Sequence, residues 1–136
     1  MITAIDSNVV LDILGADPVH GPGSLRAIGD AQELGVVMAC DQVWAEVGAN
    51  YRDPEAAADA LDGLGIRFAA IDPEVAAAAG RVWWDHRRRG GIRERMLADF
   101  VIGTHAWMRS DRLLTRDRGF YREYFKRLRV VDPSAG

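Results

Sequence analysis

The 136-residue chain has one cysteine, Cys40, and one lysine, Lys126. A single cysteine excludes an internal disulfide and any zinc site built from several cysteines. Met38 and Ala39 precede Cys40, so we expect its thiol to be a small core side chain rather than a reactive one. No apolar run approaches the roughly 18 residues that span a bilayer, and residues 1–11 lack the basic segment of a signal peptide. These absences predict a cytoplasmic protein without a membrane anchor.

Charge is divided unevenly along the chain. Residues 1–80 hold 13 acidic residues and 3 arginines, a net charge of −10, whereas residues 81–136 hold 7 acidic and 14 basic residues, a net charge of +7. Arginine forms bidentate contacts with phosphate that lysine cannot form. The basic half therefore predicts an anionic partner such as nucleic acid. A general preference for arginine and alanine codons is the alternative explanation.

Short apolar segments alternate with segments of helical spacing along the whole chain. Strands are expected at residues 2–5, 36–39, 66–71, 112–115 and 128–131. Helices are expected from residues 6–8 to about 14, over 24–34, 41–51 and 54–63, from 73 to a break at 87–91, and over 93–108 and 119–125. This alternation predicts an α/β fold with a parallel sheet covered on both faces. We expect one domain over residues 1–136.

Four acidic residues occupy positions that this topology brings together. Asp6 follows the first strand and Asp117 the fourth, so both are expected at the same edge of a parallel sheet. Glu46 lies in the helix after the second strand. Asp99 is flanked by apolar residues, and a buried carboxylate needs a partner or a metal ion. For Asp6 alone, a role as a helix N-cap remains an equal alternative.

Carboxylates gathered in one pocket raise one another's pKa. A hard divalent cation removes that penalty, because Mg²⁺ and Mn²⁺ prefer oxygen ligands. Such a cation also lowers the pKa of a bound water and stabilises the oxygens of a phosphodiester under attack. Nearby arginines can hold the flanking phosphates. An acidic metal site beside a basic segment is therefore the arrangement that phosphodiester hydrolysis needs.

The motifs that carry these acids resemble those of PIN domains. The segment from Ala4 to Asp12 is similar to the opening motif, in which Asp is followed by Ser or Thr and then Asn. Residues 98–106 resemble the third-acid motif, residues 114–117 with Phe120 resemble the fourth, and Glu46 falls at the second. The resemblance covers essentially the whole chain, whose length is that of VapC-type toxins of bacterial toxin–antitoxin pairs. Gly103 stands where the family often has alanine.

The resemblance implies a three-layer α/β/α sandwich around a five-stranded parallel sheet. It also implies an Mg²⁺- or Mn²⁺-dependent endoribonuclease that cleaves RNA, forms a homodimer and binds a cognate VapB-type antitoxin. On this interpretation the metal ligands and catalytic residues are Asp6, Glu46, Asp99 and Asp117, and the residues near the substrate are Ser7, Asn8 and Arg116. Ser7 would orient the carboxylate of Asp6 or contact the phosphate. Ser7 and Asn8 would then cap the first helix in place of Asp6.

Three other classes of protein match the sequence less well than PIN domains do. A haloacid-dehalogenase-like phosphatase needs a second Asp where this chain has Asn8, and both it and a phosphoacceptor receiver domain need a lysine that Lys126 does not supply convincingly. A PIN-like domain that binds RNA or protein without cleaving is the remaining alternative. Metal-dependent cleavage of single-stranded RNA separates it from the nuclease.

The sequence leaves open the roles of two features near residue 85, a pair of adjacent tryptophans and a run of three arginines. Adjacent residues diverge on a helix, so one of Trp83 and Trp84 is expected in the core and the other on the surface, where an aromatic side chain can meet a dimer or antitoxin partner. The three arginines at residues 87–89 are expected to form a solvated helix end. A contact of these arginines with RNA or the antitoxin is the alternative. His105 is expected to be a partly buried structural residue.

Overall fold

The computed structural model of the chain describes residues 1–90 and 97–134. Five strands form one sheet in the order β3-β2-β1-β4-β5, and every neighbouring pair is parallel. The strands are β1 (Ile2–Ile5), β2 (Val36–Cys40), β3 (Arg67–Ala69), β4 (Arg112–Leu114) and β5 (Val130–Val131). The parallel sheet predicted from the sequence is therefore confirmed, although β3 and β5 are shorter than expected.

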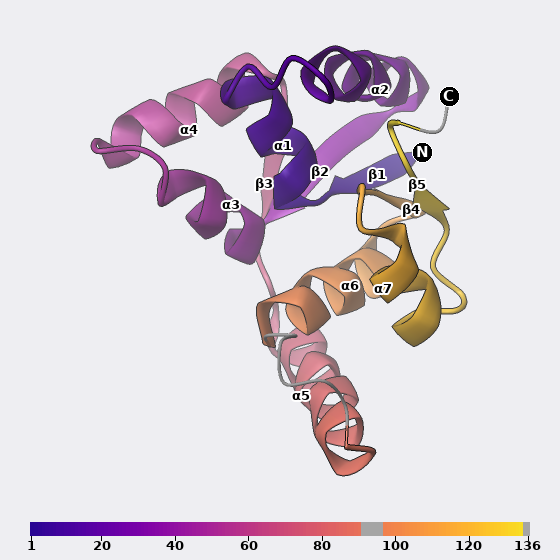
Figure 1. The fold of residues 1–136 in the computed structure, drawn as a ribbon. Coiled ribbons are helices and arrows are strands. Elements are labelled where there is room, and N and C mark those ends of the chain that lie inside the picture. The colour runs from indigo at the N-terminus through magenta and orange to yellow at the C-terminus, as the bar shows by residue number, and fades with distance from the viewer. Residues whose placement is uncertain (91–96, 135–136) are drawn as a thin grey trace.

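Helices cover both faces of this sheet (Figure 1). One layer contains α1 (Ser7–Leu14), α2 (Gly21–Leu34), α3 (Asp41–Gly48) and α4 (Pro54–Gly63). The opposite layer contains α6 (Leu97–Arg109) and α7 (Arg118–Tyr124), with α5 (Pro73–Arg88) packed against α6. This arrangement is the predicted α/β/α sandwich. No helix within the described ranges is long and apolar enough to cross a membrane.

The core lies around the central strand β1. Ala4 and Ile5 of β1, Val9 and Val10 of α1, and the leucines of β4 are all buried. Cys40 is buried at the end of β2, and burial raises the pKa of its thiol to about 11. The prediction of an unreactive core thiol is thus confirmed, because the thiolate is the reactive form.

The topology reverses direction at β1. The chain passes from β1 to β2 and β3 on one side, and then returns through α5 and α6 to place β4 on the other side of β1. In open α/β sheets, ligands bind at such a switch point, outside the carboxyl ends of the strands. The residues that follow β1 and β4 therefore occupy the expected position of a functional site.

Some helix ends differ from the prediction. The second helix begins at Gly21 rather than at Ser24, because Pro22 fits the first turn of a helix. Ser24 donates to Asp12 at 3.1 Å instead of capping. The helix expected over 93–108 is described from Leu97, and its predicted residues 93–96 lie outside the described ranges.

The two adjacent tryptophans of α5 divide as predicted. Trp83 is half-buried and packs against the core, whereas Trp84 is 39% exposed. His105, expected to be partly buried, is almost completely buried in α6. Burial lowers the pKa of its imidazole, which favours the neutral form.

Candidate functional site

Asp6 lies between β1 and α1 and is the N-cap of α1. Its Oδ1 accepts a hydrogen bond from the backbone N–H of Ser7 at 2.8 Å. The expectation that Ser7 and Asn8 cap this helix in place of Asp6 is therefore wrong. Only 5% of Asp6 is exposed. Burial raises the pKa of its carboxyl, and the negative charge of Glu46 adds to this effect, while interactions with Thr115, Tyr121 and Ser7 oppose it.

Ser7 connects two of the predicted acids. Its hydroxyl donates to Oε2 of Glu46 at 2.7 Å and lies 3.5 Å from Oδ1 of Asp6. A serine hydroxyl has one proton, so the shorter contact with Glu46 is the hydrogen bond. Gln42 donates to the other Glu46 oxygen at 3.4 Å. Ser7 therefore holds the carboxylate of α3 beside the carboxylate that follows β1.

Thr115 is a central residue whose role the sequence analysis missed. Its buried hydroxyl donates to Oδ2 of Asp6 at 2.8 Å and accepts from the backbone N–H of Asp117 at 3.0 Å. The amide of Asn8 also approaches this hydroxyl at 3.3 Å. The available signal was local, because threonine hydroxyls commonly bond the backbone two residues further on. One side chain thus links the loops that follow β1 and β4.

Asn8 and Arg116, both predicted near the substrate, bind other parts of the protein. Asn8 donates to Oδ2 of Asp6 at 3.3 Å and accepts from the backbone N–H of Arg116 at 3.2 Å. The Arg116 guanidinium holds both oxygens of Asp12, with Nε at 2.7 Å and Nη2 at 2.9 Å. Because the Asp12 side chain is only 6% exposed, this pair compensates a buried charge. The structure therefore gives Arg116 a partner within the protein, and its role near the substrate stays a prediction.

Tyr121 of α7 is a second residue that the sequence analysis missed. Its side chain is fully buried, and no partner lies in good hydrogen-bonding geometry around its hydroxyl. Burial raises the pKa of the phenol well above its ordinary value, and the charges of Asp6, Asp99 and Asp117 raise it further. The negative charges of three of the four predicted acids therefore act on the Tyr121 hydroxyl. The sequence signal was its position four residues after Asp117, one helical turn away.

Asp99 and Asp117 are both half-buried. Asp99 lies in the first turn of α6, and Asp117 precedes α7 at the N-cap position without a side-chain capping bond. Together with Asp6 and Glu46 they supply only hard oxygen donors, the type that Mg²⁺ and Mn²⁺ prefer. Across residues 1–90 and 97–134, however, no three carboxylate, histidine or cysteine side chains are grouped closely enough to hold a metal ion. The donor chemistry fits a divalent cation, but a closed set of ligands is not preassembled.

The sequence was compared with models of known families. A model of the PIN domain matches residues 3–126. The chain belongs to the PIN domain family. No curated protein sequence matches it. The predicted PIN-like fold and its five-stranded parallel sheet are therefore confirmed.

Solved structures with the same fold come from toxin–antitoxin complexes. VapBC2 from Rickettsia felis, bound to a DNA fragment from its promoter, matches with a TM-score of 0.77 and 16% identity over 97% of this chain and 98% of that chain. VapBC-1 from nontypeable Haemophilus influenzae matches with a TM-score of 0.73 and 14% identity over 98% and 99%. FitAcB from Neisseria gonorrhoeae matches with a TM-score of 0.69 and 22% identity over 100% of both chains. At these identities the likeness concerns the fold.

Proposed function

We propose that this PIN domain is a metal-dependent endoribonuclease that acts in the cytoplasm as the VapC-type toxin of a toxin–antitoxin pair. The observation that carries the proposal is the shared environment of Asp6, Glu46, Asp99 and Asp117. Asp6 and Glu46 meet through Ser7, and Asp6, Asp99 and Asp117 all act on the buried hydroxyl of Tyr121. Such a concentration of carboxylates has little structural benefit without a cation.

The four acids would hold Mg²⁺ or Mn²⁺ and would be the catalytic residues. The bound cation would supply a water of lowered pKa and positive charge for the phosphate oxygens. The protein's own contribution is to position these acids. Ser7 keeps Glu46 beside Asp6, and Thr115 holds Oδ2 of Asp6. Burial raises the pKa of Asp6, and a nearby cation would oppose this shift by favouring the ionised form.

The proposed partners are a cognate VapB-type antitoxin and a second copy of the chain. Support for the antitoxin comes from the solved structures of similar fold, which are VapBC and FitAB assemblies. The proposed substrate is RNA, in agreement with the basic second half of the chain. An antitoxin that covers the acidic site would keep the nuclease inactive.

A PIN domain that binds RNA without cleaving it is the second candidate. The observation that favours it is that the carboxylates of the described residues do not form a closed group of three metal ligands. The two candidates agree on RNA binding and differ on metal-dependent cleavage.

The deciding experiment incubates the purified protein with single-stranded RNA in Mn²⁺, in Mg²⁺ and in EDTA. We expect internal cleavage products with either cation and none in EDTA. Asp6→Asn should abolish cleavage, whereas Asp30→Asn, which removes an equal charge from an exposed position on α2, should cleave normally. RNA binding without cleavage under all conditions would support the second candidate instead.

A further inference from the structure

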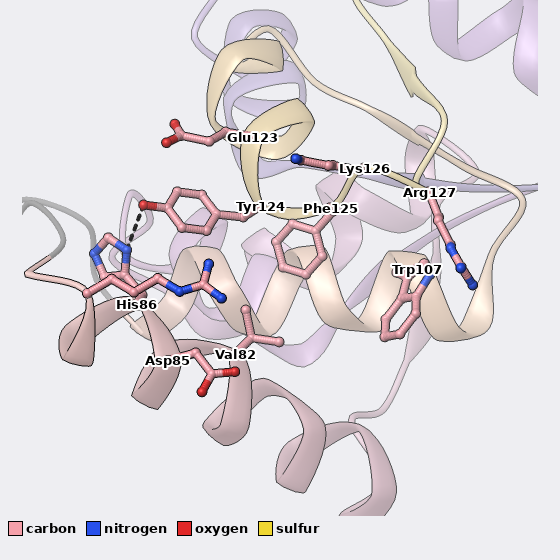
Figure 2. Close-up of a pocket in the computed structure, with 10 residues that line it drawn as sticks. Val82, Asp85, His86, Trp107, Glu123, Tyr124, Phe125, Lys126 and Arg127 are labelled. Carbon is pink, nitrogen blue, oxygen red and sulfur yellow. Dashed lines mark hydrogen bonds between the residues drawn. The ribbon is translucent and has the colours of Figure 1, made fainter.

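A groove lies between α5, α6 and the end of α7, separate from the acidic site. Its volume is about 770 Å³, within the range of ligand-binding clefts. We call it the α5–α7 groove. It is lined by Val82, Asp85, His86, Arg89, Trp107, Glu123, Tyr124, Phe125, Lys126 and Arg127. Figure 2 shows that these side chains converge from α5, α6 and the segment at the end of α7.

Packed aromatic side chains form one part of the groove. His86 Nδ1 and the Tyr124 hydroxyl are 2.7 Å apart (Figure 2), and both rings pack on Phe100. Phe125 packs directly on the backbone of α6 at Gly103, where a Cβ atom would lie 2.3 Å from its ring. The glycine that departs from the family's usual alanine therefore permits this close contact. It fixes the end of α7, and with it Lys126 and Arg127, above α6.

The rim of the groove has the chemistry of a nucleic-acid surface. Trp107 is 46% exposed with Arg127 beside it, and Lys126 is exposed on the same segment after α7 (Figure 2). Arg89 adds a third positive charge. Of the two lining acids, Asp85 lies 3.8 Å from Arg81, which offsets part of its charge. An exposed indole next to cations is typical of surfaces on which the bases of a single strand stack while phosphates meet positive charge.

The adjacent face of α5 continues this pattern. The exposed ring of Trp84 lies between the guanidinium groups of Arg81 at 4.9 Å and Arg88 at 4.7 Å. Arg87 stacks on Trp83 at 4.2 Å. These contacts hold the arginines extended over aromatic surface, where they add positive potential near the groove. The solvated helix end expected at residues 87–89 is therefore also an ordered arginine–tryptophan surface.

The groove is within reach of the acidic site. Asp117 precedes α7 and the groove residues Tyr124 to Arg127 lie at its end, so seven helical residues, about 10 Å, separate the two. On α6, Asp99 and Trp107 are eight residues apart, about 12 Å along the helix axis and about 80° around it. A strand bound at the acids can therefore extend into the groove.

We propose that the α5–α7 groove binds a single-stranded RNA segment that flanks the scissile bond. A base would stack on Trp107, and phosphates would contact Lys126 and Arg127. This proposal rests on the proposed RNA substrate but not on cleavage itself. The groove would therefore contribute to which RNA is held across the acidic site.

The test measures binding of a short, fluorescently labelled single-stranded RNA by anisotropy in EDTA, where cleavage plays no part. Trp107→Ala should weaken binding at least about fivefold, the size expected for loss of one stacked base. The double variant Lys126→Gln/Arg127→Gln should also weaken binding and should lower the slope of log affinity against log salt by about 1.4, or 0.7 for each lost phosphate contact. The matched control, Arg26→Gln/Arg67→Gln, removes two exposed charges outside the groove and should leave that slope near the wild-type value.

Several outcomes would overturn the proposal. If the groove and control double variants lost equal RNA affinity, the protein would attract RNA by its positive charge without a specific site. Unchanged RNA binding by Trp107→Ala, together with a changed sedimentation coefficient or a lost antitoxin complex, would make the groove a protein interface. If Trp107→Ala fails to fold by circular dichroism, Trp107→Phe and the charge variants decide the question. Wild-type protein that binds RNA through the groove but does not cleave it in Mn²⁺ would support the groove while refuting the proposed nuclease.

Discussion

The hydroxyl of Thr115 donates a hydrogen bond to Oδ2 of Asp6 at 2.8 Å, although the two residues are 109 positions apart in the sequence. The same hydroxyl accepts the backbone N–H of Asp117 at 3.0 Å. One buried oxygen therefore sets the relative position of two proposed metal ligands. It does so at the switch point of the sheet, where β1 and β4 pair.

Thr115→Val should destabilise the protein by about 1–3 kcal/mol, because it removes the buried hydroxyl that donates to Asp6 and accepts from the Asp117 N–H. Valine has a similar shape, so lost packing contributes little. Thr115→Ser keeps the hydroxyl and is the matched control. Urea denaturation of the three proteins in EDTA measures the effect. If valine and serine proved equally well tolerated, the hydroxyl would have no positioning role.

Asp6 should make the metal-free protein less stable as the pH rises. Its folded-state pKa is raised above 3.8, so its contribution to stability is present below 3.8 and is lost as the pH rises through the folded-state pKa. In EDTA, the unfolding free energy of wild type should therefore fall relative to Asp6→Asn between acidic and neutral pH. Urea titrations at several pH values measure this difference. If the difference in unfolding free energy between wild type and Asp6→Asn did not vary with pH, the raised pKa of Asp6 would be refuted.

Below pH 3.8, where Asp6 is protonated in the folded and unfolded states, Tyr121→Phe should not reduce the stability of the metal-free protein, because the hydroxyl it removes is buried without a hydrogen bond of good geometry. The pKa of Asp6 should rise, since its interaction with the Tyr121 hydroxyl lowers that pKa. The control is Tyr124→Phe, which removes a hydroxyl bonded to His86 and should cost about 1 kcal/mol. Thermal denaturation and carboxyl NMR titration measure the two effects. A larger loss of stability at Tyr121 than at Tyr124 would contradict this interpretation.

Gly103→Ala should destabilise the protein by about 1–3 kcal/mol through overpacking, because the new Cβ would lie 2.3 Å from the buried ring of Phe125. Gly80→Ala in α5 is the matched control, since nothing lies within 4 Å of its Cβ position. That substitution should instead stabilise the helix by about 0.5–1 kcal/mol. Chemical denaturation of both variants reports the sign of each change. Opposite signs are expected, and a stabilising Gly103→Ala would rule out the close packing of α7 on α6.

Much of the fold could be predicted because its signals are local. Apolar runs marked the strands, and Asp72 followed by Pro73 marked the start of α5, where Asp72 caps the helix through the N–H of Val75. The start of α2 was predicted three residues late. Ser24 has the chemistry of a cap, but its hydroxyl binds Asp12, a partner that only the tertiary structure brings near.

The site was less predictable than the fold. Placement after β1 and β4 indicated Asp6 and Asp117, since strand ends are implied by topology. The partners of these acids were not implied, because the bonds of Thr115 and the buried position of Tyr121 depend on packing between distant segments. The salt bridge of Arg116 could not be predicted for the same reason. Its charge suggested a phosphate contact, whereas the buried carboxylate of Asp12 binds its guanidinium.

The most direct test of the account is the rate of RNA cleavage as a function of Mn²⁺ concentration, compared between wild type and Asp99→Asn. Asp99 acts on the Tyr121 hydroxyl together with Asp6 and Asp117, although it belongs to a different element from either. We predict a rate that saturates with Mn²⁺ for wild type and no detectable cleavage by a folded Asp99→Asn protein. Full activity of Asp99→Asn, or wild-type cleavage that continues in EDTA, would contradict the proposal that these acids form one cation-dependent catalytic site.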